Sequence, residues 1–237
     1  MHWCLGMYGS ASTWTFNLVQ KLAATLVPGH PVAPHIVADS LPDLDDSAST
    51  LVIKTHATSA AEELAQRATA IIITIRDPRD AIASLMAHNK APFDLALHLT
   101  KATAFMCARL VTHDRALLLW FEDRFYDNPT TIDKLAATFN AELSDVDRNR
   151  IFAETRRKVI EDFIADLETL PTVESEFDEL TGQQDTHDQI TGWHKHHAGR
   201  KGEIGRWRRE LSSSQVTAIE DCLRGWMESF TYQTSTL

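Results

Sequence analysis

The chain has 237 residues, of which 43% are hydrophobic, which is enough for one sizeable α/β domain but not for two. Its formal charge of −10 argues against a general binder of nucleic acid or of anionic membranes, which normally has a net basic surface. Cys4, Cys107 and Cys222 lie far apart, so no disulfide framework is indicated and a reducing cytoplasm is expected. No apolar run approaches the ~20 residues of a membrane span, and no leader pattern opens the chain, so we expect a soluble protein.

The first 26 residues predict a strand, a loop and a helix. The strand is expected over residues 3–8, which are apolar, and the helix over 15–26, where apolar residues recur at helical spacing. The loop between them has little side-chain bulk and consists of Gly9, Ser10, Ala11, Ser12 and Thr13. Backbone N–H groups of such a loop can converge on an anion at the positive end of the next helix, so we expect a phosphate site here.

This loop differs from the P-loop of nucleoside-triphosphate enzymes. The spacing from Gly6 to Thr13 is the same, but Ala11 stands where the second glycine belongs and Ser12 where the lysine belongs. A kinase that uses ATP and Mg²⁺ is therefore disfavoured. A purely structural alternative also remains for this stretch, in which Ser12 or Thr13 caps the helix.

The next stretch predicts a connection and a strand with polar residues at its end. Residues 27–49 contain four prolines and several aspartates, so we expect an irregular connection with a short strand near 35–37. Residues 50–55 form a β-branched run that predicts a strand and leads directly into His56. Lys54 and His56 then lie at the carboxyl end of that strand.

An α/β alternation follows. Residues 70–75 are almost all β-branched, which predicts a central strand covered on both faces, and helices are expected over 59–67 and 93–112. A further helix begins near Pro78. Another strand is expected over 116–121, followed by a helix over 130–139. This order predicts a parallel sheet with helices on both faces and a ligand at the carboxyl ends of the strands.

The last third of the chain has weaker patterns. Residues 144–170 have a charged, helical pattern, and an amphipathic helix is expected over 212–230. Residues 171–187 are acidic and weakly patterned, which predicts a mobile loop that could act as a lid. Residues 194–202 concentrate positive charge. They include His194, His196 and His197, which have no neighbouring carboxylate or cysteine in the sequence, so we expect them to be solvated and to bind no metal.

Four of these segments, taken together and in order, resemble the cytosolic-type sulfotransferases. They are residues 8–14, Lys54-Thr-His56, the run 76–84 with Arg76 and Ser84 eight apart, and the Arg-Lys-Gly-x-x-Gly-x-Trp pattern of 200–207. A weaker fifth segment comprises Phe121-Glu-Asp123 and Asn128-Pro129. The family transfers a sulfuryl group from 3′-phosphoadenosine 5′-phosphosulfate (PAPS) and releases 3′-phosphoadenosine 5′-phosphate (PAP). The resemblance implies a single P-loop-like domain over 1–237, and a small-molecule acceptor bearing a hydroxyl or an amine.

The resemblance also implies roles for individual residues. The loop from Gly9 to Thr13 would bind the 5′-phosphosulfate, and Trp14 would stack on the adenine, with Phe121 as a weaker second candidate. Segments 76–84 and 200–207 would hold the 3′-phosphate through Arg76, Ser84, Arg200, Lys201 and Gly202.

His56 would act as the general base. The family normally has Lys or Arg at the position of Gly9, and this chain does not. Lys54 is our candidate for the cation near the leaving group. A strand's period of two places Lys54 on the same side as His56. Three possibilities remain: a sulfotransferase that uses no metal, a relative that binds PAP or PAPS without turnover, or a nucleotide kinase. The sequence does not identify the acceptor or the oligomeric state.

Overall fold

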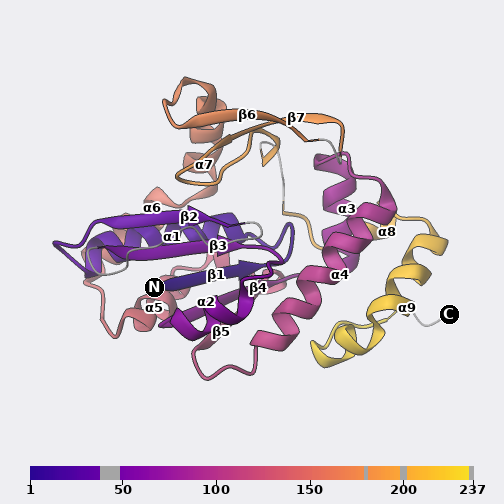
Figure 1. The fold of residues 1–237 in the computed structure, drawn as a ribbon, viewed down its shortest axis with the longest axis horizontal. Coiled ribbons are helices and arrows are strands. Elements are labelled where there is room, and N and C mark those ends of the chain that lie inside the picture. The colour runs from indigo at the N-terminus through magenta and orange to yellow at the C-terminus, as the bar shows by residue number, and fades with distance from the viewer. Residues whose placement is uncertain (38–48, 179–180, 198–201, 235–237) are drawn as a thin grey trace.

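The computed structural model describes residues 1–37, 49–178, 181–197 and 202–234 (Figure 1). Its centre is a parallel five-stranded sheet in the order β2-β3-β1-β4-β5. The strands are β1 (His2–Gly6), β2 (Val32–Ile36), β3 (Thr50–Thr55), β4 (Ala70–Ile75) and β5 (Ala116–Trp120). The predicted α/β class with a central parallel sheet is therefore confirmed. Arg200 and Lys201, to which the sequence assigns the 3′-phosphate, lie outside the described residues.

Helices cover both faces of the sheet, as its apolar strands require. Along β4, Ile71 and Ile73 pack into one hydrophobic core and Ile72 packs into the other. This alternation follows from the strand's two-residue period, and it places a helical layer over each face. The strand is fully buried, as its β-branched sequence predicted.

Each helical layer combines segments from distant parts of the chain. One layer contains α1 (Ser12–Leu26), α5 (Thr130–Ala136) and α6 (Asp145–Glu154). The other contains α2 (Ala61–Arg67), α3 (Pro78–His88), α4 (Phe93–Leu110) and α9 (Ser213–Ser229). The short helix α8 (Trp207–Glu210) packs against α3 and precedes α9 in the chain, and α7 (Arg157–Ala165) follows α6. None of the described helices combines the length and apolar character needed to cross a membrane.

The expected loop over 171–187 is wrong, because most of this stretch is an antiparallel hairpin. Its strands are β6 (Val173–Asp178) and β7 (Gln183–Asp188), and they form a separate two-stranded sheet. The hairpin packs against the 3₁₀ turns Leu167–Thr169 and Lys195–His197 and lies apart from the central sheet (Figure 1). Its strands are mostly exposed, so they lack the apolar alternation by which a half-buried strand is recognised.

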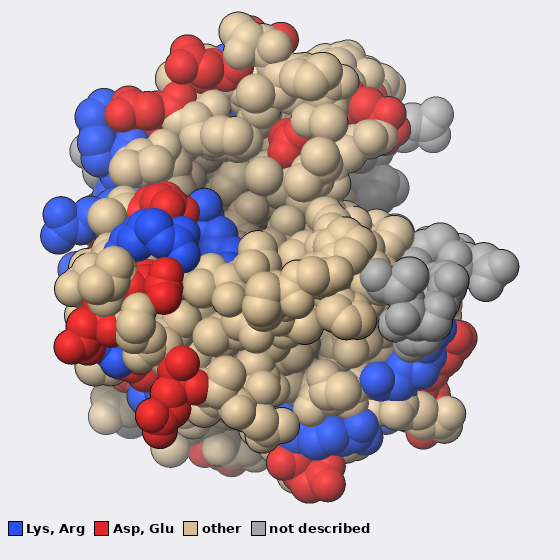
Figure 2. Space-filling model, turned by 90° about the vertical axis from the view of Figure 1, so that its left-hand side faces the viewer, with Lys and Arg blue, Asp and Glu red and all other residues tan. Residues whose placement is uncertain are grey.

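Further boundaries also differ from the expectation. The strand expected near 35–37 spans Val32–Ile36 instead. The strand predicted over 116–121 ends at Trp120, because Phe121–Asp123 forms a 3₁₀ turn that is followed by Arg124 in the left-handed region, at φ 51°. The helix predicted over 130–139 becomes a 3₁₀ turn at Ala137–Phe139. On the face drawn in Figure 2, basic side chains of the described residues lie among acidic ones, and the hollow between its upper and lower parts is mostly uncharged.

Candidate active site

A cavity of about 710 Å³ lies at the carboxyl ends of the sheet strands. The loop after β1, His56 after β3, Arg76 after β4 and Phe121 after β5 all contribute to its wall. A ligand site is expected at this edge in an open parallel sheet, and the volume suits a nucleotide-sized ligand. The predicted residues that line it are Gly9, Ala11, Ser12, Thr13, Trp14, Lys54, His56, Arg76, Ser84, Phe121 and Gly202.

Ser10 is the described member of the predicted set that does not line the cavity. Its hydroxyl group donates to the Met7 carbonyl oxygen at 2.6 Å and lies 2.7 Å from the Thr74 hydroxyl, and its backbone N–H also donates to Met7. The side chain is fully buried. Ser10 therefore fixes the loop to β4 and has no donor left for a ligand.

The loop after β1 leaves the start of α1 open. Helix α1 begins at Ser12, and its cap residue Ala11 has a left-handed φ of 64° and makes no side-chain capping hydrogen bond. The structural alternative, in which Ser12 or Thr13 caps the helix, is therefore not observed. A left-handed alanine costs roughly 1 kcal/mol, and such strain is typical of loops that approach a ligand closely.

The Lys or Arg that the resemblance implies at residue 9 would be strained in this loop. The φ of Gly9 is 69°, and a Cβ atom at this position would lie 3.3 Å from the Ser84 hydroxyl oxygen and 3.5 Å from Nη1 of Arg76. Any side chain at residue 9 would thus be strained and would crowd two predicted ligand-binding residues. Gly9 brings the loop backbone close to α3, so a cation for the same region must come from another element.

Arg76 joins the loop to the segment after residue 201. Its Nη1 donates to the Gly9 carbonyl oxygen at 3.0 Å, its Nη2 donates to the Glu203 carbonyl oxygen at 2.6 Å, and its guanidinium lies 4.2 Å from the centre of the Phe121 ring. The side chain is buried, and burial lowers its pKa although Asp80 lies nearby. Its Nε has no hydrogen-bond partner among the described residues. A buried guanidinium with an unused donor fits an anionic ligand.

Asp80 holds the same two segments together from the other side. Its fully buried carboxylate accepts hydrogen bonds from the backbone N–H groups of Gly205 at 2.6 Å and Trp207 at 3.0 Å. The two sequence segments predicted to bind one 3′-phosphate are therefore adjacent in space. Ser84 lies one turn further along α3, and no described residue hydrogen-bonds its hydroxyl group, which leaves this group for a ligand.

His56 is held as a neutral base. Its Nδ1 lies 2.7 Å from the Gly6 carbonyl oxygen, and its ring stacks on Tyr8 with centroids 3.9 Å apart. Because a carbonyl only accepts, Nδ1 must carry the proton, and Nε2 keeps its lone pair. Burial and the nearby Lys54 lower the pKa of His56 to about 3, so the imidazole is neutral near pH 7.

Lys54 is a buried cation beside this histidine. Its side chain is 3% exposed, and no described carboxylate lies within ion-pairing distance of its ammonium group. Burial lowers the pKa of Lys54 to about 8. Both Lys54 and His56 line the cavity, as the strand's period predicted.

The two aromatic candidates have different surroundings. The Trp14 indole N–H donates to the Thr155 carbonyl oxygen at 2.9 Å, which fixes the ring at the cavity wall. One face of Phe121 is covered by Arg76, and Tyr126 lies 5.0 Å away. Tyr126 also lines the cavity, and sequence reasoning missed it because it lies in a 3₁₀ turn between the two parts of the fifth segment.

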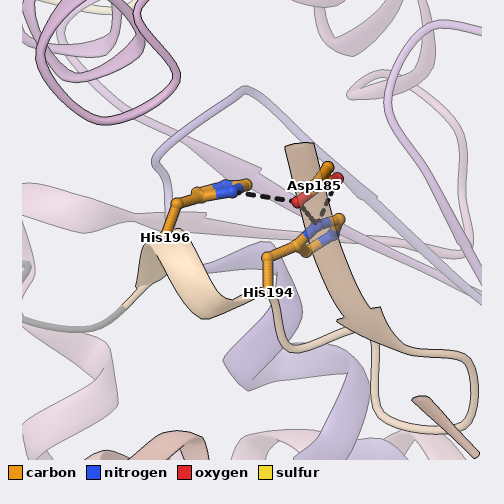
Figure 3. A group of neighbouring side chains, drawn as sticks. All are labelled: Asp185, His194 and His196. Carbon is orange, nitrogen blue, oxygen red and sulfur yellow. Dashed lines mark hydrogen bonds and ion pairs between the residues drawn. The ribbon is translucent and has the colours of Figure 1, made fainter. Parts of the chain in front are cut away.

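The histidine group near the hairpin is not solvated as expected. The Asp185 carboxylate accepts a hydrogen bond from Nδ1 of His194 at 2.8 Å and another from Nδ1 of His196 at 3.2 Å (Figure 3). Both imidazole side chains are 23% exposed. The carboxylate partner was missed because it lies in β7, within the stretch expected to be a loop. All three residues line the cavity, as does Trp193.

Comparisons with known proteins support the fold. No protein-family profile and no curated protein sequence matches this chain. The mouse sulfotransferase SULT7A1 in complex with PAP superposes with a TM-score of 0.61 at 12% identity, over 96% of this chain and 84% of that one. Retinol dehydratase with androsterone and PAP gives a TM-score of 0.63 at 14% identity, over 96% and 80%. Retinol dehydratase with retinol and PAP gives 0.62 at 13%, over 96% and 81%. The chain therefore has the sulfotransferase fold.

Proposed function

We propose that this protein is a sulfotransferase that moves a sulfuryl group from PAPS to a hydroxyl or amine of a small-molecule acceptor. The observation that carries the proposal is the position of Arg76. Its buried guanidinium bonds both the loop after β1 and the segment at Glu203, and its Nε remains without a described partner. A compact anion with several oxygens would satisfy this donor.

The described residues fit the proposed nucleotide. The uncapped start of α1 offers backbone N–H groups and the positive end of a helix to a 5′-phosphosulfate. Arg76 and the Ser84 hydroxyl would bind the 3′-phosphate, and Gly202 lies beside Phe121 and Tyr126. Trp14 supplies an aromatic wall for the adenine. Arg200 and Lys201 are proposed as further 3′-phosphate ligands from the sequence alone.

His56 supplies the base. Its Nε2 would take the proton of the acceptor's hydroxyl or amine while the acceptor forms a bond to sulfur and the bond from sulfur to the PAP oxygen breaks. The hydrogen bond to Gly6 keeps the other ring nitrogen protonated, which fixes the tautomer that this role needs. The stack on Tyr8 fixes the orientation of the ring.

Lys54 supplies positive charge for the departing oxygen. Sulfuryl transfer resembles phosphoryl transfer in that positioning and charge stabilisation do most of the work. The loop contributes only neutral donors, because residues 9–13 are Gly, Ser, Ala, Ser and Thr, and a side chain at Gly9 would be strained. Lys54, in β3, and His56, just after the end of β3, line the same cavity. Lys54 would stabilise the leaving oxygen, and His56 would take the acceptor's proton.

Binding of the product nucleotide tests the nucleotide half of the proposal. PAP should raise the melting temperature of the protein far more than adenosine 5′-phosphate does, because Arg76 and Ser84 address the 3′-phosphate, which only PAP carries. Ser84→Ala should narrow the difference between the two nucleotides, whereas Ser59→Ala, an exposed position, should leave it unchanged. Equal shifts with both nucleotides would remove the assignment of Arg76 and Ser84.

A further inference from the structure

A second group of polar side chains lies in the cavity wall away from Arg76. Asp185 comes from β7, and His194 and His196 come from the 194–197 turn that packs against this strand (Figure 3). The carboxylate of Asp185 lies between the two imidazoles and accepts from Nδ1 of each. One possible ligand atom from each residue lies within 4.8 Å of those of the other two.

This spacing is close to that of a metal site. Zinc bonds of about 2.0–2.2 Å in tetrahedral geometry place neighbouring ligand atoms about 3.3–3.6 Å apart. The single oxygen Oδ1 of Asp185 lies 3.0 Å from Nδ1 of His194 and 3.2 Å from Nδ1 of His196, slightly shorter than this spacing. For a cation to bind both Nδ1 atoms, each neutral imidazole would carry its proton on Nε2 instead, and the three side chains would turn so that their lone pairs meet at one point.

His187 provides an independent observation beside the group. It lies two residues after Asp185 in β7, so both side chains leave the same face of the strand. Its ring stacks on that of His194 with centroids 5.1 Å apart. Its Nδ1 is buried and has no hydrogen-bond partner among the described residues. A buried imidazole nitrogen without a partner is costly, and it provides a further nitrogen next to the cluster.

We propose that Asp185, His194 and His196 bind one divalent transition-metal ion, with Zn²⁺ as the favoured occupant. Two imidazoles and one carboxylate suit zinc, whereas Mg²⁺ and Ca²⁺ prefer oxygen ligands throughout. Three protein ligands leave a fourth position, and because all three residues line the cavity, that position is available to a molecule inside it.

The site would also tie the hairpin to the rest of the cavity wall. Residue 192, in the turn between β7 and His194, lies close to β2 and β3, since a Cβ atom on Gly192 would lie 2.7 Å from Cδ1 of Ile36 and 3.9 Å from Cδ of Lys54. A bound ion would thus fix this turn and β7 together over the end of the sheet. Metal binding of this kind does not depend on the proposed sulfuryl transfer and can be measured without nucleotide.

The test is a zinc titration of the full chain, purified without a histidine tag and stripped with a chelator. Calorimetry should give one saturable site per chain, and Zn²⁺ should raise the melting temperature reversibly. Asp185→Asn and His194→Gln should each weaken zinc affinity by ~100-fold or more, since even supporting residues of a metal site contribute 10–100-fold. His113→Gln is the matched control, because His113 pairs with Asp114 in a surface turn and has no second imidazole beside it.

Imidazole nitrogen NMR of the unmutated protein keeps the test valid if a variant fails to fold. Stoichiometric Zn²⁺ should shift the Nδ1 resonances of two histidines. One of these two signals should be absent from the His194→Gln spectrum and the other from the His196→Gln spectrum. Absence of saturable zinc binding would overturn the proposal. So would equal zinc affinity in the unmutated protein, Asp185→Asn and His194→Gln. The three side chains would then form a hydrogen-bonded network alone. PAP affinity measured in the same samples separates this outcome from failure of the nucleotide site.

Discussion

Lys54 occupies a position in which stability and the proposed activity conflict. The ammonium group is buried without a described carboxylate partner, and burial lowers its pKa from 10.5 to about 8. A folded-state pKa below the unfolded one means that the charged form destabilises the fold near pH 7. Such a residue is more readily explained by a need for charge in the cavity than by packing.

Lys54→Met should therefore make the protein more stable and less active. The free energy of unfolding at pH 7 should rise by ~1–3 kcal/mol, because an unpaired buried cation is removed. Turnover should fall by ~10²-fold or more, the range seen when one donor to a transition-state charge is lost. Urea denaturation and sulfuryl-transfer assays measure the two effects. A variant that keeps full turnover would place the leaving-group cation elsewhere, with Arg206 next to test.

The pH dependence of activity should follow from the same residues. His56, with a pKa near 3, is already a free base at pH 5, so kcat/KM should be level between about pH 5 and 7. Above about pH 8 it should fall as Lys54 loses its proton. Cys4 and His194 are the other titratable groups that act on Lys54, and neither adds a charge that favours its ammonium form near pH 7. A profile that rises through pH 6–7 would contradict the neutral His56.

The free energy of unfolding should also depend on pH through Lys54 and His56. Between pH 8 and 10.5 the unfolded chain binds a proton at Lys54 that the folded protein does not, so the contribution of Lys54 to stability rises with pH across this window. For His56 the window lies lower: from pH 6.5 down to about 3 the unfolded chain gains a proton and stability falls. Denaturation curves of the unmutated protein and Lys54→Met should diverge most below pH 8 and converge above pH 10.

At the scale of elements, α3 links the two segments assigned to the 3′-phosphate. Arg76, just before the helix, and Asp80, in its first turn, bond backbone groups of Glu203, Gly205 and Trp207. Sequence reasoning gave Asp80 no role. The structure shows that it positions the segment after residue 201 against α3.

Asp80→Asn should weaken PAP binding, although the side chain of residue 80 is not expected to contact PAP. An amide can accept only one of the two backbone N–H bonds well, so the 202–207 segment should loosen, with a stability loss of about 1–3 kcal/mol. PAP affinity should fall ~10-fold while its preference over adenosine 5′-phosphate is reduced. Asp94→Asn, an exposed change in the first turn of α4, is the control and should alter neither property. Unchanged affinity in Asp80→Asn would show that the segment is held by other contacts.

The elements that the sequence predicts well are those with both faces buried. The bounds of β3 and β4 match the expected ranges, because uninterrupted β-branched runs occur where helices cover both sides of a strand. The 173–188 hairpin was missed because its residues are largely exposed and polar. Its pairing depends on contacts with turns from other parts of the chain, which no local pattern records.

At the scale of the whole molecule, one half of the cavity could be predicted from the sequence and the other half could not. The loop after β1, His56 and Arg76 follow strands of the central sheet, so topology alone brings them to one edge, and the sequence could predict their association. The Asp185 contact to His194 requires the hairpin, and the crowding at Gly9 requires the position of Ser84 on α3. Both depend on packing between distant segments, so sequence reasoning did not find them.

Transfer of a labelled sulfuryl group measures the proposed reaction itself. The protein would be incubated with ³⁵S-labelled PAPS and a panel of phenols, alcohols and amines, in parallel with His56→Ala. We expect labelled product with at least one acceptor class, and a rate ~10²–10⁴-fold lower in His56→Ala with PAP affinity nearly intact. No transfer to any acceptor by a protein that binds PAP would show a non-catalytic binder, and an unchanged rate in His56→Ala would contradict the assignment of the base.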